Sequence, residues 1–237
     1  MNPAVEAVSV FFPCFNDEAT IARMVEVAVA TLARVGVCEA EVIVVNDGST
    51  DGSAAVLADL MIHEPLLRVV THDHNRGYGG ALLSGFGAAK HQWVFYTDGD
   101  GQYDPSDLPR LLDLVRADTG LVNGYKLERH DPAHRIWIGS TYNFCARLLF
   151  RIRIRDIDCD YRLIRRNLLE RILLTSTSGT ICVELVRKIE LTGCGVAETG
   201  VHHYPRLHGT SQFFRVKSLL KTLIELVRLW VRVVVLP

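Results

Sequence analysis

Apolar and polar positions alternate in blocks along the first half of the chain. Short apolar runs rich in β-branched and aromatic residues predict buried strands at residues 8–12, 41–45, 67–71 and 92–97. The longer stretches that separate them have the composition of helices, at residues 19–35, 53–63 and 79–91. Strands that alternate with helices predict an α/β fold with a mostly parallel sheet covered on both faces. Ligands bind such sheets at the carboxyl ends of the strands.

The second half continues this pattern and then departs from it. A helix is predicted at residues 108–116 and a strand at 120–125, followed by a basic loop and a helix around residues 141–150. Residues 216–236 are largely apolar, but Lys221, Glu225, Arg228 and Arg232 recur at spacings of four, three and four. These spacings put the four charges on one helical face. We therefore expect one α/β unit over residues 1–214 and an amphipathic helix over residues 215–237.

Two aspartates follow the fourth predicted strand. Asp98 and Asp100 are separated by Gly99, which lets the chain turn so that both carboxylates can approach one ion. Carboxylate oxygens are hard ligands that suit Mg²⁺ or Mn²⁺. The same residues are equally compatible with a solvated Asp-Gly turn. The spacing alone leaves both interpretations open.

Two more polar segments follow the second and third predicted strands. Asp47 lies at a strand end, where a carboxylate is placed to accept hydrogen bonds from a base or a ribose, whereas Asp51 is better explained as a helix cap. The segment Asn-Arg-Gly-Tyr-Gly-Gly at 75–80 precedes a helix, so it permits close backbone approach and a phosphate at the helix N-terminus. It matches neither the dinucleotide-binding fingerprint nor the Walker P-loop, and is weak evidence by itself.

Taken in order, four segments resemble those of family 2 glycosyltransferases with the GT-A fold. They are Pro-Cys-Phe-Asn-Asp-Glu at 13–18, Val-Asn-Asp-Gly-Ser-Thr-Asp at 45–51, the glycine-rich segment at 75–80, and Thr-Asp-Gly-Asp-Gly-Gln-Tyr-Asp-Pro at 97–105. Within that family they are most similar to the dolichyl- and polyprenyl-phosphate sugar synthases. The resemblance runs from about residue 8 to residue 214. It implies an enzyme that transfers a sugar, with inversion, from a nucleotide-diphosphate sugar.

The resemblance also implies roles for single residues, with a donor half at about 1–126 and an acceptor half at 127–214. The nucleotide sugar would contact Pro13, Phe15, Asn16, Glu18, Asp47, Arg76, Gly77, Gly79 and Lys126. A Mg²⁺ or Mn²⁺ cofactor and the diphosphate would contact Asp98, Asp100 and Gln102. The acceptor phosphate would contact Arg135, Ser140, Arg206 and Ser211. Lys126 stands where the family usually has arginine, so the bidentate fork is lost.

The acceptor class depends on how the reaction is activated. A lipid phosphate is ionised near neutral pH, with a second pKa of about 6, so it needs orientation by Arg135 and Arg206 and no strong base. A hydroxyl acceptor would need a carboxylate base, for which Asp158 and Asp160 are the candidates. These candidates leave the acceptor class open, and the resemblance to the polyprenyl-phosphate sugar synthases implies a polyprenyl phosphate acceptor. The alternatives are a soluble enzyme that glycosylates a hydroxyl and, less favoured, a silent nucleotide-sugar-binding subunit.

Composition narrows the class of protein further. The chain has 237 residues, of which 49% are apolar and 22% charged, as in one large globular unit. Its net charge of −1 gives no support for nucleic-acid binding. Six scattered cysteines without Cys-x-x-Cys spacing predict reduced thiols, mostly in the core. With no basic segment and apolar core at the N-terminus, we expect a cytoplasmic protein without a signal peptide.

The charged stripe bears on membrane contact. A spanning helix of ~20 residues would not tolerate four charges on one face. We expect instead an amphipathic helix in the membrane interface, with Trp230 at headgroup level, so that the protein is peripheral at the inner face. The alternative is a helix packed on the rest of the chain or in the interface of a homo-oligomer.

Overall fold

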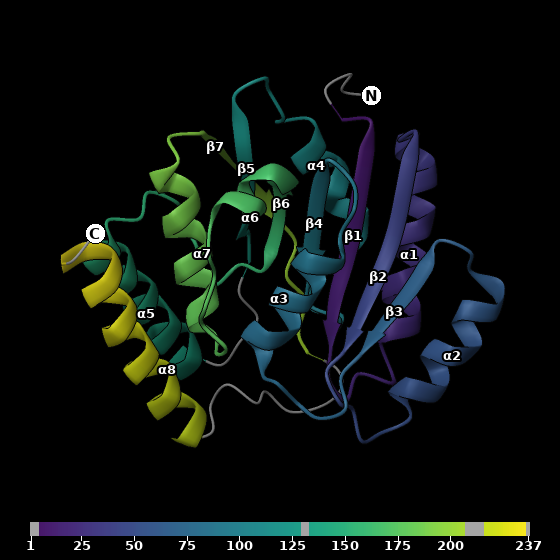
Figure 1. Ribbon diagram of the computed structural model, residues 1–237, viewed down its shortest axis with the longest axis horizontal. Helices are drawn as coiled ribbons and strands as arrows, with labels where there is room; N and C mark the ends of the chain where they lie inside the picture. Colours follow the sequence, from purple (N-terminus) through teal and green to yellow (C-terminus); the bar gives the residue numbers. More distant parts are fainter. Residues whose placement is uncertain (1–4, 129–132, 207–215, 236–237) are drawn as a thin grey trace.

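The computed structural model describes residues 5–128, 133–206 and 216–235 (Figure 1). Within these residues, seven strands form one sheet in the order β3-β2-β1-β4-β6-β5-β7. The strands are β1 Ala7–Cys14, β2 Glu39–Asn46, β3 Leu67–Thr71, β4 Trp93–Thr97, β5 Thr119–Lys126, β6 Tyr161–Arg165 and β7 Gly195–Val201. The helices are α1 Ile21–Val35, α2 Ser53–His63, α3 Tyr78–Ala88, η1 Pro105–Asp107, α4 Leu108–Leu112, α5 Ala133–Phe150, α6 Arg166–Arg171, α7 Thr180–Leu191, α8 Val216–Trp230 and η2 Val231–Val235.

The sheet is mostly parallel, as predicted. Strands β3, β2, β1 and β4 pair in parallel, and so do β5 and β7. Strand β6 alone among these seven runs the other way, because it pairs antiparallel with both β4 and β5. The α/β fold class is therefore confirmed, with one antiparallel strand inserted between β4 and β5.

Helices cover both faces of the sheet and enclose two apolar cores (Figure 1). On one face, α1 and α4 pack on the strands through residues such as Val25, Leu32 and Leu111. On the other face, α3, α5, α7 and α8 pack through residues such as Leu82, Phe150, Leu185 and Leu229. Burial on both sides explains why the central strands consist of nearly continuous apolar residues.

Several predicted element bounds were wrong. The helix predicted at 108–116 is shorter, because α4 ends at Leu112 and tight turns follow it. The helix predicted around 141–150 begins at Ala133, and that predicted at 79–91 ends at Ala88. Strand β6 was missed, because it carries a fully buried arginine, Arg162, in the middle of an apolar pattern.

Helix α8 packs on the α/β unit beside α5 and α7 (Figure 1). Leu229 is buried, and the indole nitrogen of Trp230 donates to the carbonyl of Leu149 on α5 at 3.1 Å. Trp230 therefore contacts the protein. Glu225, from the predicted charged stripe, also faces the protein, whereas Leu223 and Val227 are exposed. Within the residues that the structure describes, no helix combines the length and the apolar character needed to cross a bilayer.

Candidate active site

The Asp98–Asp100 turn follows β4 directly, and side chains from several segments contact it. Asp100 Oδ2 accepts a hydrogen bond from Arg206 Nη2, and its Oδ1 accepts one from the amide of Gln102 at 3.0 Å. Gln102 Oε1 accepts from Arg206 Nε at 3.3 Å. The two predicted metal ligands Asp100 and Gln102 therefore converge on one cationic group, Arg206.

Asp98, which follows β4 directly, contacts the glycine-rich segment at 75–80. Its Oδ1 accepts a hydrogen bond from the Tyr78 hydroxyl at 2.9 Å. Burial, together with the charges of Asp160 and Asp100, raises the pKa of Asp98 well above its ordinary value. Burial likewise raises the pKa of Asp100, against the opposing charge of Arg206. Both carboxyl groups are thus in an environment where a cation would stabilise the ionised form.

Arg206 reaches this rim because the segment after β7 pairs with the turn after β4. Tyr103 and His203 form an antiparallel bridge, and the amide of Tyr204 donates to the carbonyl of Gln102 at 2.8 Å. The rings of Tyr103 and His203 also meet edge to face, with centroids 5.0 Å apart. The predicted phosphate-binding arginine is therefore held beside the two aspartates.

Asp47 follows β2 and is almost fully buried. Its Oδ1 accepts from His72 Nδ1 at 2.6 Å and from the amide of Arg76 at 2.9 Å, and its Oδ2 accepts from the amide of Gly77 at 3.0 Å. His72 Nε2 lies 2.8 Å from the hydroxyl of Ser84. Asp47 thus organises the glycine-rich loop, and its contact with a nucleotide stays a prediction.

The turn after β1 is tied to the loop after β2. Asn16 has a positive φ of 60°, its amide donates to Ser49 Oγ at 3.1 Å, and its Oδ1 accepts from the amide of Thr50 at 2.8 Å. Glu18 accepts a hydrogen bond from the amide of Gly52. Phe15 and Pro13, which are also predicted to contact the nucleotide sugar, make backbone hydrogen bonds in this turn. The Phe15 amide donates to Asp17 Oδ2, and the Pro13 carbonyl accepts from the Gly99 amide.

The acceptor-side residues lie mainly around β5 and β6. Lys126 Nζ donates to the carbonyl of Asp158 at 2.9 Å. Asp160 Oδ1 accepts from Arg162 Nη1 at 2.7 Å, from the Tyr96 hydroxyl at 3.3 Å and from the Cys182 thiol at 3.2 Å. Asp160 is therefore the counter-ion of a buried arginine, whereas the carboxyl group of Asp158 lies in the field of Lys126.

Three predicted acceptor contacts are placed only in part. Arg135 lies in the first turn of α5, but its side chain is outside the described part of the chain. Ser140 is exposed on the same helix, five residues further on. Ser211 lies outside the described residues. Their joint contact with an acceptor stays a prediction.

The family model described as glycosyl transferase family 2 matches residues 9–173. The chain belongs to this family. The matched region contains every donor-side motif described above.

Among curated relatives, the family 2 chain is 29% identical over 217 residues to an undecaprenyl-phosphate 4-deoxy-4-formamido-L-arabinose transferase of Pseudomonas aeruginosa (strain LESB58), covering 91% of this chain and 62% of the relative. It is 26% identical over 211 residues to a dodecaprenyl-phosphate galacturonate synthase of Rhizobium johnstonii, covering 86% and 61%. The chain thus spans about three fifths of the length of these relatives.

The fold is shared with solved structures. Glucosyl-3-phosphoglycerate synthase from Mycobacterium tuberculosis, in complex with Mn²⁺, UDP and glucosyl-3-phosphoglycerate, aligns with a TM-score of 0.73 and 20% identity. The alignment covers 99% of the family 2 chain and 82% of the synthase. This likeness establishes a common GT-A architecture.

Three residues that contact the candidate site were not predicted as site residues. Tyr78 and Asp17 stand inside motifs that the sequence singled out, so their positions were an available signal. Burial, with the charges of Asp100 and Asp51 and against the Phe15 amide, raises the pKa of Asp17 to about 6. His72 follows β3 without any motif, and only the fold reveals its contact with Asp47.

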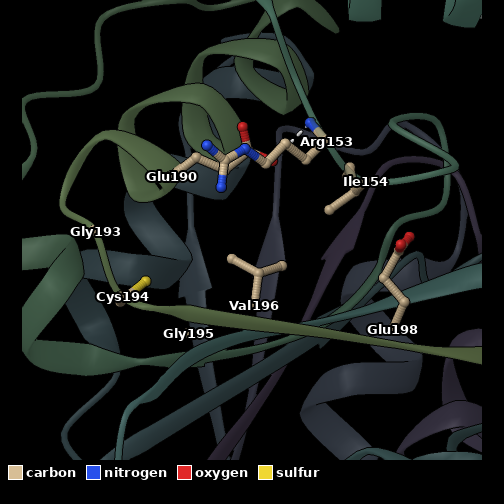
Figure 2. Close-up of a pocket in the computed structure, with 8 residues that line it drawn as sticks. All are labelled: Arg153, Ile154, Glu190, Gly193, Cys194, Gly195, Val196 and Glu198. Carbon is tan, nitrogen blue, oxygen red and sulfur yellow. Dashed lines mark hydrogen bonds between the residues drawn. The ribbon is translucent and has the colours of Figure 1, made fainter.

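A separate pocket of about 350 Å³ lies at the sheet edge formed by β7 (Figure 2). It is lined by Arg153, Ile154, Glu190, Gly193, Cys194, Gly195, Val196 and Glu198. Glu190 Oε1 accepts a hydrogen bond from the amide of Arg153 at 2.9 Å (Figure 2). None of the lining residues belongs to the predicted site, so this pocket is distinct from the rim of the family 2 site.

Asp158 gives a pH-dependent prediction. Burial raises its pKa from 3.8 to about 7, against the charge of Lys126. The folded state therefore holds this proton more tightly than the unfolded state, and the stability that it contributes is lost as the pH rises from about 4 to about 7. Asp158→Asn removes the charge, so it should raise the free energy of unfolding at pH 8 by about 1–3 kcal/mol. The gain should shrink toward zero near pH 4.

Thermal unfolding of both variants across that pH range checks this. Asp59→Asn, on the exposed face of α2, is the control and should leave the melting temperature nearly unchanged at both ends. A variant Asp158→Asn that is less stable than the wild type at pH 8 would contradict the inference that the ionised carboxylate destabilises the fold.

Proposed function

We propose that this family 2 glycosyltransferase moves a sugar from a UDP- or GDP-sugar to a polyprenyl phosphate with the help of a divalent metal. The observation that carries the proposal is the meeting of Asp98, Asp100, Gln102 and Arg206 on one rim, at the carboxyl end of β4. Relatives whose names include undecaprenyl-phosphate and dodecaprenyl-phosphate support the acceptor class. Because the chain spans only part of those relatives, acceptor and donor remain part of the proposal.

The metal proposal is supported by the donor atoms. Asp100 and Gln102 already direct oxygens at one cation, the guanidinium of Arg206, and oxygen ligands are those that Mg²⁺ and Mn²⁺ prefer. Among the described residues, no three or more His, Cys, Asp or Glu side chains cluster as a metal site, so the protein would supply few ligands and the diphosphate the others. When bound, the ion would stabilise the departing diphosphate.

The donor half would bind the nucleotide through residues that are already fixed. Asp47 holds the amides of Arg76 and Gly77, and Asn16 and Glu18 hold the loop after β2. A site built from such cross-linked loops loses little entropy when a ligand binds. Of the other proposed contacts, Pro13 and Lys126 lie at the carboxyl ends of β1 and β5, Phe15 follows β1, and Gly79 lies in the first turn of α3.

The residues of the acceptor half would orient the acceptor phosphate toward the sugar. A phosphate monoester carries its own negative charge near neutral pH, so it needs no base. Arg206 would help to hold the incoming phosphate, together with Arg135, Ser140 and Ser211, and offset the repulsion between donor and acceptor phosphates. In this mechanism Asp98 and Asp100 act on the leaving group.

A second function is favoured by one observation. The pKa of Asp158 is raised by burial to about 7, which suits a general base for a hydroxyl acceptor. A soluble enzyme acting on a small molecule or glycan would use it. A transfer assay separates the two proposals by comparing a polyprenyl phosphate with the matching polyprenol, each with UDP- and GDP-sugars and Mg²⁺ or Mn²⁺.

Transfer to the lipid phosphate alone, undiminished in Asp158→Asn, is the expected result. Transfer to hydroxyl acceptors that disappears in Asp158→Asn would favour the second function. Loss of metal dependence, or transfer that is absent with every donor and acceptor, would overturn the proposal of a metal-dependent enzyme.

Membrane contact is proposed from an exposed apolar surface on α5 and α8, which lie side by side (Figure 1). The exposed side chains are Trp137, Ile138, Phe144, Leu148 and Leu149 on α5, and Leu223, Ile224 and Val227 on α8. Exposed apolar side chains gathered on neighbouring helices are typical of an interaction surface. Arg151, Arg228 and Arg232 are exposed near it and would attract anionic headgroups. Placement at the cytoplasmic face agrees with six free cysteines.

Charging this surface should release the protein from lipid. The variant Leu223→Glu/Val227→Glu should bind vesicles of phosphatidylcholine and phosphatidylglycerol at least about tenfold more weakly than the wild type, because buried apolar area drives interfacial binding. Co-sedimentation measures this. The control Ile62→Glu/Leu173→Glu changes two apolar residues elsewhere that are even more exposed than Leu223 and Val227, and it should bind as the wild type does. Equal binding of all three proteins would rule the α5–α8 surface out, and a dimer dissociated by the first variant would identify an interface between copies.

A further inference from the structure

A loop of small polar residues, 175–179, stands between the C-terminal helix and the glycine-rich loop. It reads Thr-Ser-Thr-Ser-Gly and leads into α7. Glu184, which is fully buried, accepts hydrogen bonds from the amides of Thr175 and Ser176 at 3.1 and 2.8 Å, and pairs with Lys188 at 2.6 Å. One end of the loop is thus fixed to α7.

The other end of the loop is fixed to α8 through Glu225. Its Oε2 accepts from the amide of Ser178 at 3.1 Å and from the Ser178 hydroxyl at 2.7 Å, and its Oε1 accepts from the Thr177 hydroxyl at 3.2 Å. The hydroxyl of Thr180 donates to the carbonyl of Thr222 at 3.2 Å. Hydrogen bonds to an ionised carboxylate are stronger than those between neutral groups, so Glu225 holds this end of the loop firmly.

On its opposite side the same loop touches the glycine-rich loop by backbone. The amide of Gly79 donates to the carbonyl of Thr177 at 3.2 Å. A Cβ at Gly77 would lie 2.7 Å from the Thr177 carbonyl oxygen, and one at Gly79 would lie 2.4 Å from that of Ser176. Glycine is required at both positions because the two backbones are in direct contact. A shift of Thr177 must therefore move residues 77–79.

Those residues carry the donor side of the site. Asp47 accepts from the amide of Gly77, and Tyr78 donates to Asp98, one of the proposed metal ligands. The contacts therefore run from Glu225 through Thr177 and Ser178 to Gly79. The neighbours of Gly79 continue them, since Gly77 reaches Asp47 and Tyr78 reaches Asp98. Each step is a hydrogen bond or a backbone contact, with no flexible side chain between the two loops.

We infer that Glu225 is a positioning residue for the donor site: α8 sets the place of the glycine-rich loop through the 175–179 loop. The nature of the ligand rests on the proposed function, while the mechanical link rests on the contacts alone. Because coupling between two sites is reciprocal, whatever docks on α8 and the nucleotide would influence each other's binding. Helix α8 thus affects the affinity for the nucleotide by positioning the glycine-rich loop.

The test compares Glu225→Gln with Glu190→Gln. Both replace a glutamate that accepts a loop amide, but Glu190 holds Arg153 at the β7 pocket, away from the glycine-rich loop. Hydrogen exchange over residues 75–81 and calorimetric binding of Mn²⁺ with UDP and with GDP are measured well below the melting temperature. Glu225→Gln should speed exchange in this segment and weaken nucleotide binding about tenfold, whereas Glu190→Gln should change neither. Ser178→Ala, a milder change, should shift both in the same direction.

The outcomes separate the two ideas. Unchanged exchange over residues 75–81 in both Glu225→Gln and Ser178→Ala overturns the link, even if the melting temperature falls. Faster exchange with unchanged nucleotide affinity overturns the role in positioning. Faster exchange in a protein whose wild type binds neither nucleotide overturns the proposed donor class and leaves the link between α8 and the glycine-rich loop supported.

Discussion

Replacing Asp100 with asparagine should lower the rate of sugar transfer by about 10³-fold, which is the size of effect produced by the loss of one preorganised electrostatic group. Asparagine keeps the shape of the side chain but removes the charge that faces Arg206 and the proposed metal. The affinity for Mn²⁺, followed by its electron paramagnetic resonance signal, should fall in parallel. The fold should persist, because burial already raises the pKa of Asp100 and makes its charge costly.

Asp104→Asn is the matched control for this variant. Asp104 follows four residues later and accepts a hydrogen bond from the amide of Ser106 at 2.8 Å as the cap of η1. Its replacement should cost up to about 1 kcal/mol of stability and leave transfer nearly intact. If Asp100→Asn kept its activity within tenfold and its Mn²⁺ affinity unchanged, Asp100 would have no part in metal binding.

Arg162→Met should destabilise the fold strongly. The Arg162 side chain is fully buried and donates to Asn123 Oδ1 and to Asp160 Oδ1, both at 2.7 Å, as well as to Tyr96 and the carbonyl of Ile157. Removing one partner of a buried ion pair leaves the other uncompensated, at a cost of about 3–5 kcal/mol. For a chain of this size that corresponds to a fall in melting temperature of roughly 6–20 °C.

Two further variants make the measurement specific. Arg166→Met breaks an exposed ion pair with Glu170 just beyond the same strand and should cost less than about 1 kcal/mol. The double variant Asp160→Asn/Arg162→Met should recover part of the stability lost in Arg162→Met, because no uncompensated charge stays buried. A melting temperature of Arg162→Met within about 3 °C of the wild type would show that the buried network contributes little.

Arg162 also shows where sequence patterns fail. The strands β1 to β4 were predicted because each is a short apolar run between helices, and that local pattern follows from burial on both faces. In β6, the charged Arg162 breaks the apolar run, and its partners Asn123 and Tyr96 come from other strands. An antiparallel insertion that depends on such distant contacts has no local signal.

Helix α8 shows a second limit of sequence reasoning. Periodicity predicted one charged face on this helix, yet it could not tell which residues of the helix meet the protein. Glu225 faces inward because the loop at 177–178 offers three hydrogen-bond donors, and this leaves Leu223 and Val227 outside. The partners of an amphipathic helix decide its orientation, and they lie elsewhere in the chain.

The sequence predicted those residues of the candidate site that directly follow a strand. Asp47 and the turn after β4 follow from that rule, since parallel strands bring their carboxyl ends to one edge. The contacts that fix them come from His72, Tyr78 and Arg206, whose distances in sequence range from 20 to 106 residues. Motif spacing predicts which groups share a rim, and only the folded chain shows which of them are already paired.

The antiparallel insertion of β6 has a consequence for how the chain folds during synthesis. Strands β1 to β4 can assemble through short local crossovers as soon as residue 97 is available, but β4 gains its second neighbour only when residues 161–165 emerge. Until then one edge of β4 is an unpaired row of backbone groups, which is a template for association with other chains. Nascent or truncated chains that end between these strands should therefore depend most on chaperones.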